Sequence, residues 1–189
     1  PLKYDKDLKL IKTDKRKPEY LRREQIQTAL KYTEDKTDQL IIKLLANTGL
    51  RIHEALNITQ KQLENTDTEG NAIITIIGKN SKRRLIVIPA KLTRQLRRYS
   101  QNHKKYIFES NRKESEPLSS RSIQRRFKKL AAKIDIEENT TLYSENLKPH
   151  NLRHSFAIEA LKNKWNKLRK RISRTWKHSN HTDIYKFKR

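Results

Sequence analysis

The sequence has no cysteine, no methionine and no long apolar run, and these absences exclude several classes of protein. Without cysteine, the chain has no disulfide bond, no zinc finger of the cysteine type and no thiol nucleophile. Its longest aliphatic run, 72–77, is far shorter than the roughly 20 apolar residues that cross a bilayer. The opening PLKYDKDLKL has no apolar signal segment, so we expect an intracellular protein without a membrane partner.

Acidic residues are also scarce, because 21 Asp and Glu stand against 45 Lys and Arg, a formal net charge of +24. The hydrophobic fraction of 33% is low for a globular protein, and 189 residues suit a single domain. Basic side chains that neutralise phosphates release counterions and thereby gain affinity for a polyanion. The composition therefore indicates a nucleic acid as the partner.

Helical periodicity dominates the chain after a Lys-rich stretch, 1–17, which we expect to be a flexible lead or linker remnant. The domain itself is predicted over 18–189. Apolar residues recur at intervals of three and four in segments 19–31, 38–46, 52–56, 92–96, 119–134 and 149–161. Gly49 is expected to end the second of these helices, because glycine adopts positive φ without steric cost.

Two β-branched runs, 72–77 and 84–89, flank a polar stretch and predict an antiparallel hairpin. A short strand is expected at Tyr106–Phe108, and a loose acidic connection at 135–145. Beyond these, 162–177 holds eight Lys and Arg and no acid, with apolar residues every four positions. The predicted fold class is mainly α with a small antiparallel β-sheet (α+β).

Four separated segments resemble one known set of motifs. They are TGLRIHEAL (48–56), IGKNSKRRLIVIP (77–89), KPHNLRHSFA (148–157) and WKHSNHTDIY (176–185). In order and spacing they resemble the catalytic motifs of the tyrosine recombinases, also called the phage integrase family. The resemblance extends from about residue 18 to the C-terminus and implies the catalytic-domain fold of that family. The N-terminal core-binding domain that such enzymes carry is expected to be absent.

The resemblance implies an enzyme that breaks and rejoins DNA strands through a 3′-phosphotyrosyl intermediate, with no metal and no small-molecule cofactor. Tyr185, 32 residues after Arg153, matches the tyrosine nucleophile. Arg51 and Arg153 match the two arginines that hold the phosphate, a task suited to a planar guanidinium that keeps its proton. Lys79, 28 residues after Arg51, matches the lysine that protonates the leaving oxygen.

Three further positions follow from the same resemblance. His150 matches the histidine that hydrogen-bonds the phosphate and acts as a general base, and Glu54 matches the acid that orients its neighbours. Trp176 stands nine residues before Tyr185, where many members carry histidine, and its indole N–H can hold a phosphate oxygen. His178 would take that place only with a two-residue deletion, so Trp176 is preferred.

A helix after Ser119 or Ser120 is expected to present a cationic face to DNA, with help from the hairpin lysines. The predicted DNA-binding residues are Lys82, Arg121, Arg125, Arg126 and Lys129. A metal site built from the histidines at 150, 154, 178 and 181 is not expected, because cysteine is absent and acidic ligands near them are few.

Double-stranded DNA is thus the expected partner, and the resemblance implies a homo-tetramer on it. Two alternatives stay open. Type IB topoisomerases perform related chemistry on a similar fold but relax supercoils as monomers without preferring a site. For a basic DNA-binding protein without catalysis, Tyr185→Phe would leave DNA affinity and every other activity unchanged.

Overall fold

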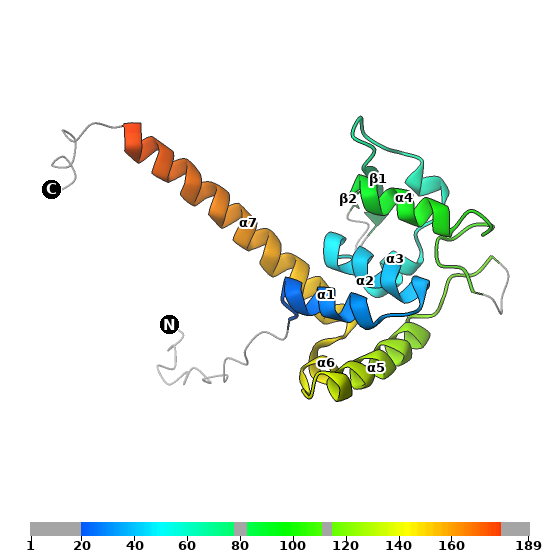
Figure 1. Ribbon diagram of the computed structural model, residues 1–189. Helices are drawn as coiled ribbons and strands as arrows, with labels where there is room; N and C mark the ends of the chain where they lie inside the picture. The colour runs from blue at the N-terminus through cyan, green and yellow to red at the C-terminus, as the bar shows by residue number, and fades with distance from the viewer. Residues whose placement is uncertain (1–19, 78–82, 111–114, 179–189) are drawn as a thin grey trace, which may run out of the picture.

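The computed structural model describes residues 20–77, 83–110 and 115–178, and the side chains of the last helix as far as Asn163. The predicted basic lead, 1–17, lies outside the described residues. The described chain consists of helices and one two-stranded antiparallel sheet (Figure 1). The predicted fold class, mainly α with a small antiparallel sheet, is confirmed.

Helix α2 (Lys36–Thr48) is the centre of the fold. The stripe predicted from its spacing is fully buried, at 0% exposure for Leu40, Ile41, Leu44 and Leu45. Each such side chain stabilises the fold by about 1.5–3 kcal/mol through burial. Around this helix pack α1 (Arg23–Tyr32), α3 (Ile52–Leu56), α4 (Ala90–Tyr99), α5 (Ser120–Glu137), α7 (Pro149–His178) and strand β2 (Arg83–Ile88). The other elements are therefore positioned by one apolar helix.

The two ends of α2 are defined by local interactions. At its start, the Asp35 carboxylate accepts a hydrogen bond from the backbone N–H of Asp38 (3.0 Å). At its end, Gly49 has φ +63° and donates its N–H to the carbonyl of Leu45 (3.0 Å), as the sequence predicted. A Cβ on Gly49 would overlap the ring of Phe156 from α7. Glycine is therefore needed both for the backbone conformation and for the close approach of α7.

The predicted hairpin consists of β1 (Ala72–Ile77) and β2, in a register that pairs Ala72 with Ile88 and Ile77 with Arg83. A short 3-10 helix, η1 (Lys61–Leu63), precedes it and contacts β1. Side chains alternate between the two faces, so that Arg84, Ile86 and Ile88 lie toward the body and the residues between them are exposed. The tip, 78–82, lies outside the described residues.

Two expectations about short segments were wrong. Tyr106–Phe108 forms no strand, because its backbone pairing is divided between partners. Tyr106 makes a single bridge with Thr59, Ile107 N–H donates to the carbonyl of Ile58 (3.0 Å), and the carbonyl of Phe108 accepts the N–H of Leu118 (2.8 Å). Within 135–145, α5 continues to Glu137 and a further helix, α6 (Leu142–Asn146), forms. The carboxylate of Asp135 accepts the backbone N–H groups of Tyr143 and Ser144, at 2.8 and 2.7 Å. A helix this short shows too few turns for its apolar period to be recognised.

Helix α7 unites two segments that the sequence separated, 149–161 and 162–177, into one helix of 30 residues. Its first turns are held in the body, where Leu152 and Ser155 are buried and the Ser155 hydroxyl accepts the N–H of Leu21 (2.9 Å). Its second half extends away from the other elements (Figure 1). Among the described helices, none is both long and apolar enough to cross a membrane.

Candidate active site

Three of the predicted catalytic side chains meet in one pocket of about 670 Å³. Arg51 stands immediately before α3, while His150 and Arg153 lie on the first turns of α7. The pocket is completed by neighbours from α3, α5 and the turn before α7: Ile52, His53, Gln124, Lys128, Ala131, Ser144, Leu147, Lys148 and Pro149. None of these described lining residues is acidic. The pocket is consequently suited to an anion.

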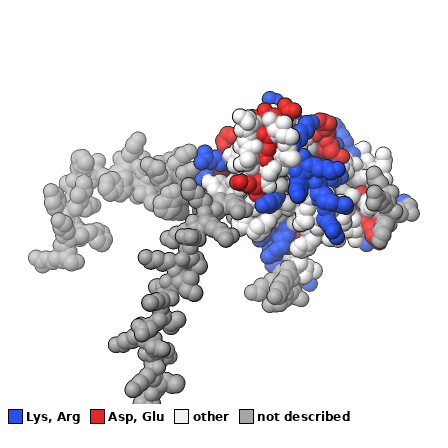
Figure 2. Space-filling view, turned by 90° about the horizontal axis from the view of Figure 1, so that it is seen from below, with Lys and Arg blue, Asp and Glu red and all other residues white. Residues whose placement is uncertain are grey.

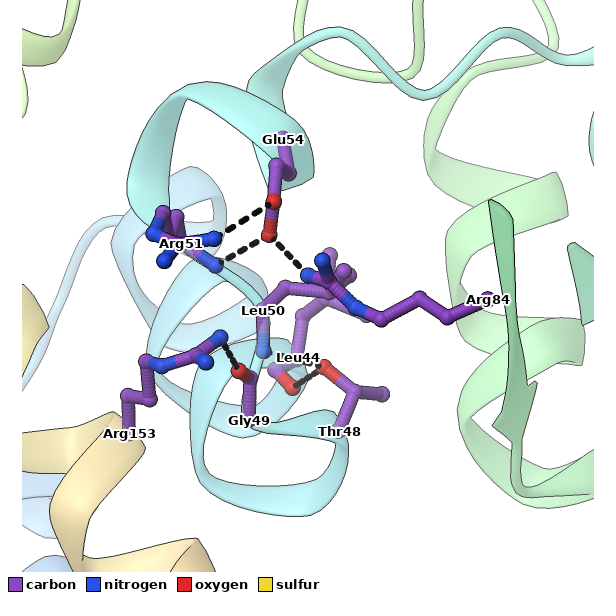
Figure 3. A network of polar contacts seen from close by, with 8 residues as sticks. All are labelled: Leu44, Thr48, Gly49, Leu50, Arg51, Glu54, Arg84 and Arg153. Atoms are coloured by element: carbon purple, nitrogen blue, oxygen red, sulfur yellow. Dashed lines mark hydrogen bonds and ion pairs between the residues drawn. The ribbon is translucent and has the colours of Figure 1, made fainter. Parts of the chain in front are cut away.

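Arg153 is held by the end of α2. Its Nη1 donates a hydrogen bond to the carbonyl of Gly49 (Figure 3). Partial burial and the positive charge of Arg51 lower the pKa of Arg153, yet a guanidinium keeps its proton in proteins. Two cations placed close together in this way are stabilised by an anion between them.

Arg51 is tied to a buried carboxylate. The Glu54 side chain is 5% exposed and accepts the backbone N–H of Arg51 at 2.7 Å, while Arg51 Nη1 lies 3.4 Å from its other oxygen. Arg84 from β2 donates to the same carboxylate at 2.5 Å (Figure 3). Burial acts to raise the pKa of Glu54, but the Arg51 N–H and the Arg84 guanidinium outweigh it and hold that pKa below its usual value. Glu54 is therefore an anion that two arginines share.

His150 is paired with a second histidine one turn later on α7. The Nε2 atoms of His150 and His154 lie 2.7 Å apart, and the rings meet edge to face with centroids 4.2 Å apart. Since one of the two nitrogens must accept the hydrogen bond, at least one ring is neutral. An imidazole in its neutral form has one nitrogen that can accept a proton, so His150 in that form is able to act as a base in the pocket.

Not every predicted site residue lies at this pocket. The backbone of Trp176 is in the last turns of α7, 23 residues after Arg153, which corresponds to roughly 35 Å along a straight helix. In this structure Trp176 is thus remote from the pocket. The remaining predicted residues, Lys79, Lys82 and Tyr185, lie outside the described residues.

The cationic face of α5 borders the pocket. Ser119 caps this helix by accepting the N–H of Ser122 (3.1 Å), as expected. Lys128 lines the pocket, and the predicted DNA-binding residues Arg121, Arg125 and Lys129 are exposed. Figure 2 looks at the molecule from the side on which α5 and α6 lie in Figure 1, and basic side chains cover a broad area there.

Arg126 requires a correction, because it is engaged inside the protein. Its Nη2 lies 2.5 Å from Asp35 and its Nε donates to Asp38 at 2.9 Å. Its side chain is only 32% exposed and lies on the face of α5 that contacts α2. A guanidinium neutralised by two carboxylates has little left to offer a phosphate. Arg126 therefore joins α5 to α2, and the prediction that it binds DNA is withdrawn.

Two residues at the site escaped the sequence reasoning. The sequence reasoning assigned no role to Arg84, although the alternation of β2 places it on the inward face, where a charge needs a partner. His154 was considered as a metal ligand and otherwise expected to pack or to support its neighbours, and its spacing of four from His150 was the available signal for their contact.

Comparisons with known proteins agree with this geometry. The phage integrase family matches residues 19–188. The chain is 30% identical over 158 residues to the tyrosine recombinase XerA of Pyrococcus horikoshii, covering 82% of this chain and 51% of that protein. It thus spans about half the length of the curated relatives it matches.

Solved structures show the same fold. A crystal structure of XerA recombinase has a TM-score of 0.60 at 24% identity, covering 78% of this chain and 52% of that one. A post-cleavage complex of the site-specific recombinase XerH with a palindromic difH substrate has a TM-score of 0.59 at 26% identity, covering 78% and 43%. With the family matched over nearly the whole sequence, the chain belongs to the phage integrase family.

Proposed function

We propose that this chain is the catalytic domain of a site-specific recombinase that cuts and rejoins double-stranded DNA through a 3′-phosphotyrosyl intermediate. The observation that carries the proposal is the convergence of Arg51, His150 and Arg153 on one basic pocket. The family match and the XerH complex with its difH substrate support DNA as the partner. An enzyme of this kind acts inside the cell, where its DNA is.

The arginines supply the electrostatic part of the reaction. Attack on a phosphodiester builds a dianion with five ligands at phosphorus, and donors already in place stabilise it without reorganisation. Arg153 is oriented by the Gly49 carbonyl and Arg51 by Glu54. Each guanidinium is able to donate two parallel hydrogen bonds to the non-bridging oxygens.

The proton transfers are assigned to the other predicted residues. The Tyr185 oxygen attacks phosphorus as His150 takes its proton, and the bond from phosphorus to the 5′-oxygen breaks as Lys79 protonates that oxygen. Trp176 is assigned a further hydrogen bond to the phosphate, which requires that the end of α7 come to a pocket, as it must for Tyr185. The phosphotyrosyl bond conserves the energy of the broken linkage, so the proposed reaction needs neither metal nor cofactor.

Tyr185 has to reach the pocket for this reaction, and α7 sets the conditions. While α7 runs straight to His178, the chain leaves the helix about 37 Å beyond Arg153. Either α7 bends when DNA binds, or a neighbouring copy in the proposed tetramer provides the tyrosine. Mixing Tyr185→Phe chains with Arg153→Ala chains separates these routes. Cleavage by the mixture shows exchange between copies, and an inactive mixture shows that each copy uses its own tyrosine.

The decisive experiment is covalent trapping. The protein is incubated in EDTA with pooled nicked duplexes that carry 5′-bridging phosphorothiolates, and adducts are resolved on a denaturing gel. We expect an adduct with the wild type and with the control Tyr106→Phe, and none with Tyr185→Phe. Salt-sensitive DNA binding without any adduct, even after a core-binding domain is added, would contradict the proposal. Relaxation of supercoiled DNA without site preference would indicate a topoisomerase instead.

A further inference from the structure

Arg84 occupies an unusual place for a basic residue of a two-stranded sheet. On β2 its exposed neighbours Arg83 and Leu85 lie on the outer face, whereas Arg84 lies on the face toward the body and is 33% exposed. Its guanidinium reaches across to α3 and donates to the Glu54 carboxylate at 2.5 Å. The contact joins residues 30 positions apart in the sequence, and its carboxylate also pairs with Arg51, which lines the pocket.

The distances around Glu54 are unequal. Arg84 lies at 2.5 Å, while the guanidinium of Arg51 lies at 3.4 Å and its side chain is 54% exposed. The carboxylate thus bonds strongly to Arg84 and only weakly to the Arg51 side chain. A carboxylate that is only 5% exposed and loses its strong partner has to find another cation, because an uncompensated buried charge is costly. The nearest cation on the same helix turn is Arg51.

We propose that Arg84 is a positioning residue, which occupies Glu54 so that the Arg51 guanidinium stays available to a phosphate in the pocket. The inference rests on the proposed function in one respect, namely that Arg51 binds the phosphate. Without Arg84, Glu54 draws Arg51 into a closed ion pair and the pocket loses one of its two arginines. Arg84 acts through Glu54 and makes no contact with the phosphate itself.

This role has a signature that simple anchoring of the hairpin lacks. If Arg84 only fastened β2 to α3, then removing Glu54 as well could not repair an Arg84 variant. If Arg84 keeps Glu54 from capturing Arg51, then Arg84→Met is harmful and the added change Glu54→Gln relieves it, because a neutral amide does not hold Arg51 as an ion pair. The sign of the coupling between the two substitutions separates these explanations.

The first test needs neither DNA nor activity. Phenylglyoxal reacts with accessible guanidinium groups, and mass spectrometry of the peptide that contains Arg51 gives the rate of its modification. We expect Arg84→Met to slow modification of Arg51 about fivefold and Glu54→Gln/Arg84→Met to restore it, an effect of the size usual for coupled ion pairs. Arg83→Met, on the outer face of the same strand, serves as the matched control and leaves the rate unchanged. Equal Arg51 rates in wild type and Arg84→Met would overturn the inference.

The second test measures adduct formation on the nicked duplexes. Arg84→Met should lower the rate about tenfold at saturating DNA, Arg84→Lys should recover most of it, and the double variant should exceed Arg84→Met. A double variant as slow as Arg84→Met, with equal melting temperatures, would overturn the inference. Failure of the proposed function appears differently, as a wild type that forms no adduct while the phenylglyoxal result still holds.

Discussion

Two arginine–carboxylate clusters in this protein have opposite charge balances. The α5 cluster has one arginine for two carboxylates and consists of Arg126, Asp35 and Asp38. The pocket cluster has three arginines for one carboxylate and consists of Arg51, Arg84, Arg153 and Glu54, of which Arg51 and Arg84 pair with Glu54. Both join elements that are far apart in the sequence, yet only the second has positive charge left over.

The difference shows how a basic residue is to be interpreted in a chain with 45 of them. In the α5 cluster the guanidinium is neutralised from within, so the cluster stabilises the contact of α5 with α2. In the pocket cluster Arg51 and Arg153 line a cavity, and their surplus positive charge suits that cavity to an anion. The ratio of cations to carboxylates in each cluster, rather than the net charge of the chain, distinguishes the two roles.

The largest effect is expected from removing a cation of the pocket cluster. Arg153→Ala should reduce adduct formation at least about 100-fold, the usual loss when a preorganised donor to a charged transition state is deleted. The rate of adduct formation on nicked duplexes measures it, with Arg98→Ala on the exposed face of α4 as the control. A loss below tenfold would place the reaction elsewhere.

Gly49 links the pocket cluster to the core, and its substitution should cost the most stability. Gly49→Ala combines a strained backbone at φ +63° with overlap of the Phe156 ring, which predicts a loss of about 2–4 kcal/mol in the free energy of unfolding. Urea denaturation measures it. Gly70→Ala is the matched control, because φ is +81° but the added Cβ would lie 3.7 Å from Ala90, so only the backbone strain of about 1–2 kcal/mol remains. If the two variants lost the same free energy of unfolding, the contact of α7 with Gly49 would not be tight.

For the α5 cluster the expected change is one of stability. Arg126→Met leaves the buried Asp38 carboxylate without its cation, which predicts a loss of about 1–3 kcal/mol in the free energy of unfolding. The double variant Asp38→Asn/Arg126→Met should recover part of that loss in urea denaturation. If Arg126→Met instead weakened DNA binding at unchanged stability, the contrast between the clusters would fail.

The buried carboxylates of the two clusters, Glu54 and Asp38, should also respond to acid in opposite directions. The pKa of Glu54 is lowered in the folded protein, so its contribution to stability is present above its ordinary value of 4.5 and is lost as pH falls through the folded value. Burial raises the pKa of Asp38, so the contribution of this group is present below 3.8 and is lost as pH rises through its folded value.

Unfolding free energies measured between pH 3 and pH 7 check this contrast. Glu54→Gln should lessen the loss of stability in acid, and Asp38→Asn should lessen the loss on the way from acid toward neutrality. Parallel changes in the two variants would contradict the assignment.

The smallest effect concerns single contacts of α5 with DNA. Arg125→Gln should lower the slope of log affinity against log salt by about 0.9, the value of one phosphate contact. Lys133→Gln on the same helix should change the slope less, because Lys133 is already paired with Glu34 at 2.5 Å. Fluorescence anisotropy with a short duplex measures both slopes. Equal changes in the two variants would remove the distinction between unpaired and ion-paired basic side chains.

Much of the fold could be predicted from the sequence where the chain repeats a pattern over several turns. The buried stripe of α2, the cap of α5 and the two strands of the hairpin all follow from apolar spacing, β-branched runs and capping residues. Segments with too few residues for a period were predicted less well, as α6 and the stretch 106–108 show. The joining of 149–161 and 162–177 into one helix was also not foreseen.

For the candidate site, the sequence by itself determined which residue types were present and at what spacing. Arg51, His150 and Arg153 could be predicted as partners because the motifs that contain them resemble those of the tyrosine recombinases. Only the tertiary structure decided which basic side chains are paired with carboxylates and which face solvent. Arg126 and Arg125 are adjacent in a basic helix, yet a helix places them on different faces, one toward two carboxylates and the other toward solvent. Ion pairs between residues that are 30 to about 90 positions apart form only when the helices and strands pack together. They therefore cannot be predicted from the local sequence.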